Sequence, residues 1–163
     1  MIVNRHRPHV LVLPEDDANR QLANGFLLDP YLSTWKIQVL EEVGGWMEVL
    51  DRFVSDHVAG MNRYADRYVV LLIDFDGREE RLQDALGKIP EALRERVFIL
   101  GTWTEPEDLK RAGLGSYETI GSLIAKDCRE QTNTTWGHAL LQHNAGELER
   151  LRDRVCPILF EAG

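Results

Sequence analysis

The chain has 163 residues, of which 44% are hydrophobic and 28% charged, and its formal net charge at pH 7 is −8. This length is typical of one domain, and the composition excludes an intrinsically disordered chain, a collagen-like chain and a disulfide-stabilised miniprotein. The acid excess also excludes a simple cationic nucleic-acid-binding sleeve, although it leaves room for a metal-bridged or locally basic site.

The cysteines and the apolar runs indicate the compartment. Cys128 and Cys156 lack the spacing of a zinc site and are expected to be free, buried thiols in a reducing compartment. No apolar run approaches the roughly 20 residues of a membrane span, and no signal peptide is recognised. The sequence therefore predicts a cytoplasmic protein that does not associate with a membrane.

Hydrophobic periodicity predicts four strands and several helices. The strands are expected at 9–13, 35–43, 68–73 and 96–100. The helices are expected at 18–28, 46–64, 78–87, 107–111 and 117–127, with one or two more within 135–155. The segment 68–73 is apolar without alternation, as expected for a strand whose two faces are both covered by helices.

The order of these elements predicts the fold. A βαβαβαβ pattern followed by helices is typical of an α/β three-layer sandwich with a central, mostly parallel sheet. We expect a single domain over 1–163, with its core at 9–110 and a helical C-terminal extension at 111–163. The charged pairs of the predicted helix at 146–154 suit either a solvated face or a homodimer seam.

Acidic side chains follow three of the predicted strands. They are Glu15 and Asp16 after the first strand, Asp74 and Asp76 after the third, and Glu105 and Glu107 a few residues after the fourth. Ligands of parallel sheets bind outside the carboxyl ends of the strands, so these acids meet at one edge if the first and third strands are neighbours.

Carboxylates at such range raise each other's pKa, and a hard divalent cation relieves their repulsion. Asp74 and Asp76 point the same way on an extended backbone. We therefore predict a Mg²⁺ or Mn²⁺ site made by Glu15, Asp16, Asp74 and Asp76, with Glu105 and Glu107 as additional acids. The alternative is that Asp16 or Asp17 only caps a helix while Asp74 and Asp76 are loop acids.

Glu15 after the first strand and the run Asp74-Phe75-Asp76-Gly77 after the third resemble the topoisomerase–primase (TOPRIM) domain over about residues 9–110. That family has a βαβαβαβ core and uses Mg²⁺ for nucleotidyl transfer or phosphodiester hydrolysis. The resemblance implies that Glu15 is the acid–base residue beside the metal and that Asp74 and Asp76 bind Mg²⁺. Asp16 departs from the family, which often has Gly at that position. No catalytic Tyr is implied, so strand passage is not expected.

The run from Leu13 to Arg20 also resembles the start of a response-regulator receiver domain. That resemblance implies that Asp16 and Asp17 bind the metal and that Asp74 accepts the phosphate. Thr102 or Thr104 would be the hydroxyl residue after the fourth strand, and Lys126 is a poor match for the lysine that receivers require. The interval between Asp16 and Asp74 is longer than the corresponding interval in most receivers. Receivers also have a fifth strand that ends in Lys-Pro, which this sequence does not convincingly show. The TOPRIM resemblance is therefore favoured.

Three functions follow as hypotheses. The first is Mg²⁺-dependent, TOPRIM-like phosphoryl transfer, as in a nuclease, with Glu15 and Asp74 as the catalytic acids and nucleic acid as a partner through a metal-bridged site. The second is a receiver-like phosphoacceptor signalling module. The third is a non-catalytic interaction protein that keeps the fold and binds a protein partner. Only the first hypothesis requires that the protein be an enzyme.

Overall fold

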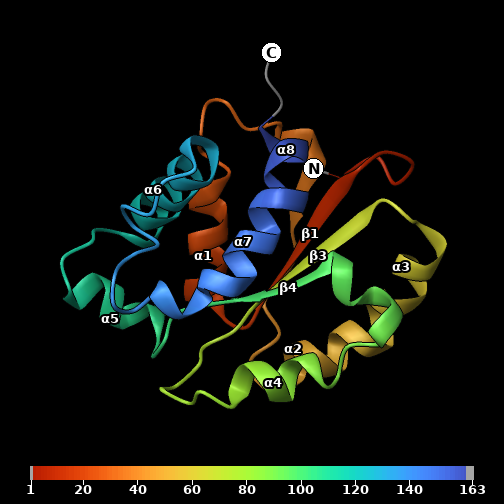
Figure 1. Ribbon diagram of the computed structural model, residues 1–163, viewed down its shortest axis with the longest axis horizontal. Coiled ribbons are helices and arrows are strands. Elements are labelled where there is room, and N and C mark those ends of the chain that lie inside the picture. The colour runs from red at the N-terminus through yellow and green to blue at the C-terminus, as the bar shows by residue number, and fades with distance from the viewer. Residues whose placement is uncertain (1, 161–163) are drawn as a thin grey trace.

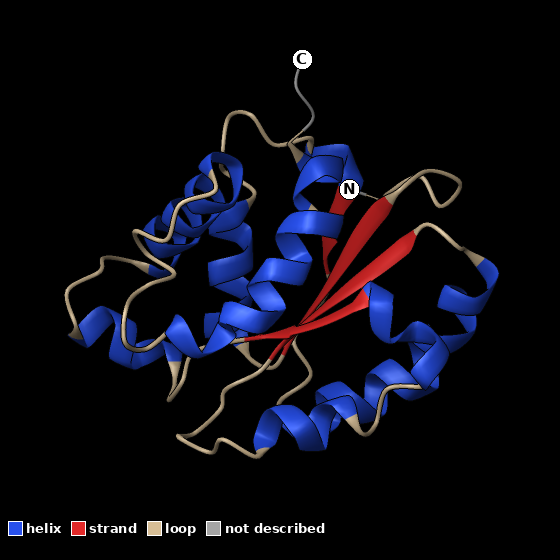
Figure 2. Ribbon diagram, in the orientation of Figure 1, coloured by secondary structure: helices blue, strands red, loops and turns tan. Residues whose placement is uncertain are grey.

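The computed structural model describes residues 2–160, which are built around a four-stranded parallel sheet. Its strands are β1 (His9–Pro14), β2 (Ile37–Val39), β3 (Arg67–Leu72) and β4 (Val97–Leu100), in the order β2-β1-β3-β4. The register places Val12 opposite Val70 and Leu71 opposite Ile99. Figure 2 shows the strands between helices on both faces, which confirms the predicted three-layer α/β sandwich.

The helices connect the strands and follow the last of them. They are α1 (Asp17–Phe26), α2 (Trp46–Arg52), α3 (Val58–Arg63), α4 (Arg81–Leu86), α5 (Pro106–Arg111), α6 (Tyr117–Glu130), α7 (Ala145–Arg154) and α8 (Cys156–Leu159). Three short 3₁₀ helices lie at η1 (Thr34–Lys36), η3 (Glu91–Arg96) and η4 (Gln142–Asn144), and a π-helical segment, η2 (Phe53–His57), joins α2 to α3. Among residues 2–160, none of the helices has both the length and the apolar character needed to cross a membrane.

Alternate strand residues enter two separate hydrophobic layers, because successive side chains of a strand point to opposite faces. Val12 and Phe98 pack in the layer formed with α1, α5, α6, α7 and α8. Leu13 and Ile99 pack in the layer formed with α2, α3 and α4. Figure 1 shows these two groups of helices on opposite sides of the sheet. Burial on both faces explains the continuous apolar character of the strands.

Two glycines allow α1 and α6 to pack closely. A Cβ atom at Gly25 would lie 2.3 Å from the carbonyl oxygen of Glu118, and one at Gly121 would lie 2.1 Å from that of Leu22. The Ser122 hydroxyl donates to the carbonyl oxygen of Gly25 at 3.0 Å. Helix α6, which belongs to the segment predicted as a C-terminal extension, thus forms part of one layer of the sandwich.

Helix α7 covers the outer edge of β4. The Ile99 N–H donates to Glu147 Oε2 at 2.8 Å, and the Asn144 side chain bonds both the N–H (3.2 Å) and the carbonyl (2.9 Å) of Gly101. These side chains satisfy backbone groups that a fifth strand would otherwise pair. The edge of the sheet is therefore closed by a helix.

Three predicted elements differ in detail from the structure. The strand predicted at 35–43 is confined to Ile37–Val39, because Trp35 belongs to the preceding 3₁₀ turn. The helix predicted at 46–64 is present but contains the π-helical segment Phe53–His57. Within 135–155, the helical part begins only at Gln142. Cys128 and Cys156 are free and buried, as predicted.

Candidate functional site

The loops after β1 and β3 bring Glu15 and Asp74 together at the carboxyl edge of the sheet. β1 and β3 are neighbours, and the Glu15 N–H continues their pairing by donating to the Leu72 carbonyl at 2.9 Å. The Glu15 carboxylate oxygen Oε2 then accepts a hydrogen bond from the Asp74 N–H at 2.5 Å. The two acids predicted to be catalytic therefore lie in direct contact.

Asn19 links Asp16 to Asp74. Its side-chain Nδ2 donates to Asp16 Oδ1 at 2.9 Å and to Asp74 Oδ1 at 2.8 Å, and the residue is only 1% exposed. Asp16 also caps α1 by accepting a hydrogen bond from the Asn19 N–H at 2.9 Å. Asp16 therefore caps α1 and also belongs to the acidic cluster, two roles that were alternatives in the sequence analysis.

Asp76 faces a buried arginine rather than the other acids. Its carboxylate lies 2.9 Å from Arg81 Nη1, and the same nitrogen donates to the Asp74 carbonyl oxygen at 2.6 Å. The guanidinium of Arg81 stacks over the ring of Trp46, 4.5 Å from its centroid. Asp76 has a positive φ of 50°, followed by Gly77 at 68°, so this tight turn directs the Asp76 carboxylate toward Arg81.

Burial and mutual repulsion raise the pKa of both central acids. The pKa of Glu15 rises to about 7, first through burial and then through Asp16 and Asp76, against the hydrogen bond from Asp74 and the charge of Arg81. The pKa of Asp74 rises to about 7, first through burial and then through Glu15, Asp16 and Asp76, against the hydrogen bond from Asn19. The pair therefore changes its charge near neutral pH.

The acids predicted after β4 lie on a separate element. Glu105 precedes α5 and its carboxylate is 3.6 Å from Arg111, while Glu107 lies in the first turn of α5. Within the described residues neither forms a hydrogen bond or ion pair with the four central acids. Burial raises the pKa of Tyr117, and the charges of Glu107 and Asp16 raise it further. Helix α5 contacts α1, whose N-cap is Asp16.

The four central carboxylates keep oxygen atoms free for a ligand. Each of Glu15, Asp16, Asp74 and Asp76 has one oxygen that accepts no hydrogen bond from residues 2–160. Within that same range, no three Asp, Glu, His or Cys side chains are grouped tightly enough to hold a metal ion.

The residues implied by the receiver resemblance lie partly at this site, because Asn19 joins Asp16 to Asp74 and the loop after β4 pairs with the loop after β3 through the carbonyls of Thr102 and Thr104. Asp17 is exposed and pairs with Arg20 at 3.0 Å, outside the contacts of the central acids. Thr102 is buried at the end of β4, Thr104 is half-buried, and Lys126 is exposed on α6. Helix α7 occupies the edge where a fifth strand would pair.

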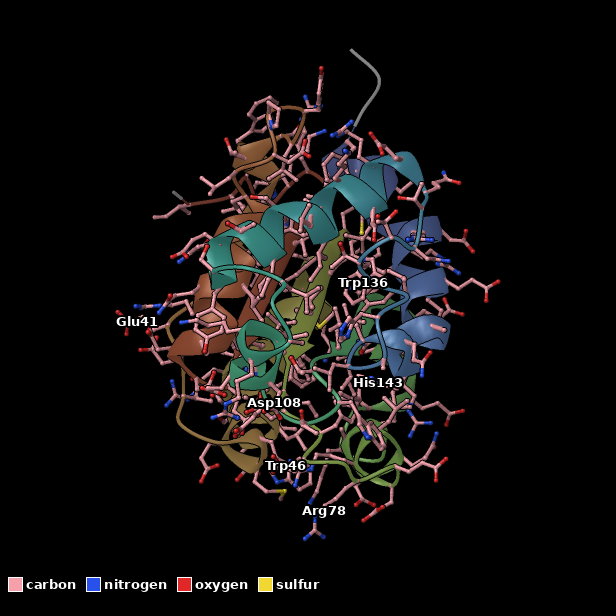
Figure 3. All side chains as sticks on the ribbon, turned by 90° about the vertical axis from the view of Figure 1, so that its left-hand side faces the viewer. Glu41, Trp46, Arg78, Asp108, Trp136 and His143 are labelled. Atoms are coloured by element: carbon pink, nitrogen blue, oxygen red, sulfur yellow. The ribbon has the colours of Figure 1, made fainter. Side chains whose placement is uncertain are left out.

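Sequence reasoning missed four residues that shape the site. Asn19 and Arg81 bind the acids directly, Trp46 stacks on Arg81, and His143 supports the loops after β3 and β4. The His143 ring lies 4.7 Å from the Phe75 centroid, and burial lowers the pKa of His143 to about 4, so it is neutral at pH 7. Figure 3 shows Trp46 and Arg78 at one end of the molecule and the half-buried His143 nearer its middle.

Only the burial of Asn19 had a signal in the sequence. It is a polar residue beside Ala18, on the apolar stripe of α1. Arg81 belongs to a charged run in which nothing distinguishes it, and Trp46 has the spacing of an ordinary core residue. No family model, no curated protein and no solved structure matches the chain, so its contacts alone characterise this site.

Proposed function

We propose that the chain is a Mg²⁺-dependent phosphoryl-transfer protein whose reacting centre is formed by Glu15 and Asp74. One observation above all supports the proposal: at the sheet edge the Glu15 carboxylate accepts a hydrogen bond from the Asp74 N–H, and the carboxyl groups of both residues have a pKa of about 7. Perturbed, interacting carboxyl groups of this kind are common at catalytic sites. Nucleic acid is the substrate class that the TOPRIM resemblance implies.

Glu15 is suited to proton transfer. A group with a pKa near 7 accepts and releases protons at neutral pH, which is what a general acid–base catalyst needs. In hydrolysis, the Glu15 carboxylate would take the proton of the water whose oxygen attacks phosphorus. The phosphorus–oxygen bond of the ester then breaks, and the leaving oxygen would take up the proton that Glu15 received from the water.

The remaining acids are suited to a cation. A bound Mg²⁺ would neutralise phosphate charge and activate a water molecule. Asp74 would hold the ion, with Asp16 and Asp76 beside it, and Glu15 would keep its carboxylate free to take the proton. Because the net charge is −8, we expect a phosphate group to approach through such a cation rather than through a basic surface.

Calorimetric titration with Mn²⁺ tests the proposal. Asp74→Asn keeps the shape of the side chain and its ability to accept from Asn19, but removes the charge. We expect it to weaken Mn²⁺ binding by at least about tenfold and to abolish cleavage of a phosphodiester oligonucleotide. Asp51→Asn, at an exposed position of α2, is the matched control and should change neither.

Two results would overturn the proposal. The first is wild-type protein that binds Mn²⁺ more weakly than about 1 mM, since even weak protein sites for divalent ions reach that range. The second is unchanged Mn²⁺ affinity in Asp74→Asn.

A further inference from the structure

Three arginine side chains converge on one tyrosine ring at the amino end of the sheet. The guanidinium carbons of Arg5, Arg63 and Arg67 lie 5.9, 5.5 and 4.9 Å from the centroid of the Tyr64 ring. Among residues 2–160, none of these arginines forms an ion pair. The arginine cluster, by which we mean these three residues and Tyr64, therefore keeps its positive charge on a protein whose net charge is −8.

Buried and backbone groups hold the centre of the cluster in place. Arg67 Nε donates to Nε2 of the buried His9 at 2.9 Å. A Cβ atom at Gly60 would lie 2.6 Å from Arg67 Nη1, so the glycine leaves room for this guanidinium. Arg96 Nη1 donates to the carbonyl oxygens of Tyr64 and Arg67 at 3.1 and 2.9 Å. A guanidinium fixed in this way loses little conformational entropy when it binds a ligand.

The charges of the cluster act on one another. Burial and then the charge of Arg5 lower the pKa of Arg67. A hydrogen bond from Arg5 and the charges of all three arginines lower the pKa of Tyr64. Asp66, which precedes Arg67 and is exposed, forms no ion pair with any of them within the described chain. A bound anion would relieve the repulsion between the guanidinium groups.

A nucleic-acid strand matches the cluster in charge and in shape. Guanidinium groups bind phosphate through paired N–H donors, and unpaired bases stack on aromatic rings and on guanidinium planes. Arg5 and Arg63 are exposed, which suits a polyanion that lies along the surface better than a small ligand, whose sites are concave. We propose that the arginine cluster binds the phosphate backbone of a single-stranded nucleic acid.

The cluster and the proposed reacting centre lie at opposite ends of the same strand. Arg67 begins β3 and Asp74 follows its end, so roughly 20 Å of extended chain separates them. Figure 1 shows the loop before β1 beside the start of β3, where His9 pairs with Arg67. The cluster would thus hold a strand away from the acids. That this strand is a substrate rests on the proposed function, but its binding needs no metal.

Fluorescence anisotropy with a labelled single-stranded oligonucleotide in EDTA measures this binding, because no divalent cation is then present at the acidic site. Each phosphate contact to a single strand adds about −0.7 to the slope of log association constant against log salt concentration, so three arginines predict a slope of about −2. Arg5→Gln combined with Arg63→Gln should bring the slope to about −0.7 and weaken binding at least about tenfold. Arg78→Gln, at an exposed position after β3, is the control and should change neither.

Three results would overturn the proposal. They are wild-type binding weaker than about 100 µM in low salt, an unchanged slope in the double variant, and equal affinity for a polyglutamate peptide, which would assign the cluster to acidic protein partners. Both replaced side chains are exposed, so the double variant should keep the thermal midpoint of wild type. If the oligonucleotide binds through the cluster while the protein binds no Mn²⁺, the nucleic-acid surface stands and the proposed metal-dependent function fails.

Discussion

Two carboxyl groups at the edge of the sheet are kept partly buried by the backbone around them. Glu15 receives the Asp74 N–H, and Asp74 receives the Asn19 amide, so each has only one hydrogen bond against the cost of its burial. Burial is the largest cause of the raised pKa of both groups. Burial disfavours the charged form of these carboxyl groups, so their ionisation lowers the stability of the folded protein unless a ligand compensates for it.

The raised pKa values predict how stability depends on pH. Ordinary values of 4.5 for Glu and 3.8 for Asp become about 7 in the folded protein, so the folded state binds more protons than the unfolded state between about pH 4 and pH 7. The stabilising contribution of the pair is present below pH 4 and is lost as the pH rises through 7. In metal-free buffer, the pair should therefore lower the free energy of unfolding in urea from pH 5 to pH 7.5. His9, His57 and His143 act in the opposite direction up to about pH 6.5, because burial lowers their pKa values.

Glu15→Gln isolates the contribution of one member of the pair. This variant should show a shallower decrease over the same interval, because the introduced amide does not ionise and Asp74 loses a neighbouring charge. Glu48→Gln, at an exposed position of α2, is the control and should follow the wild-type slope. Parallel pH profiles for wild type and Glu15→Gln would contradict the assignment.

At the scale of the elements, α7 takes the role of a missing strand. Asn144 and Glu147 lie three residues apart, so both side chains project from one side of the chain toward β4. They bind Gly101 and Ile99, and Arg150, three residues further on, pairs with Glu147 at 2.6 Å. A helix thereby protects the edge strand from pairing with another chain.

Glu147→Ala should destabilise the protein by about 1–3 kcal/mol, because it leaves the buried Ile99 N–H without an acceptor. Glu147→Gln, which keeps an acceptor, should cost less. Glu149→Ala, at an exposed position of the same helix, should change the free energy of unfolding by less than about 0.5 kcal/mol. Urea unfolding at pH 7 measures all three variants, and equal effects of Glu147→Ala and Glu149→Ala would refute the edge-capping role.

The fold was predictable because the sequence of each longer strand is enough to identify it as a strand. Both faces of β1, β3 and β4 are buried, so short apolar runs mark them, whereas β2 is only three residues long and its signal extended into the neighbouring turn. Residues 135–141 form turns although their apolar content resembles that of a helix. The prediction of an acidic edge assumed that the first and third strands are neighbours. Only the structure shows this order, because strand pairing depends on contacts between residues that are distant in sequence.

The site was predictable only in its acids. Glu15, Asp74 and Asp76 follow strands, so a general rule about parallel sheets places them at one edge. Asn19, Arg81 and Trp46 lie in helices, where residues of these types are also common without any contact to a functional site. The pair Asp76-Gly77 marks a turn, but nothing in the sequence indicates that this turn, with its positive φ at Asp76, brings the Asp76 carboxylate to Arg81.

At the scale of the whole molecule, the sheet couples the two helical layers. Each of β1, β3 and β4 contributes side chains to both layers, and the backbone groups of β4 are bound by α7. The helices after residue 111 also cover the face on which Val12 and Val70 lie. Removing either layer would expose one face of every strand to water, which is unfavourable in proportion to the apolar area exposed.

We therefore expect the two layers to unfold together. Trp136 is buried in the layer with α6 and α7, and Trp103 packs in the layer with α4, so variants that keep only one of them, with Phe at the other Trp positions, report on one layer each. Within each variant, the urea midpoints of fluorescence and far-ultraviolet circular dichroism should coincide, as in two-state unfolding. If residues 111–163 were instead a detachable extension, the Trp136 fluorescence would change at lower urea, before most of the helical signal is lost.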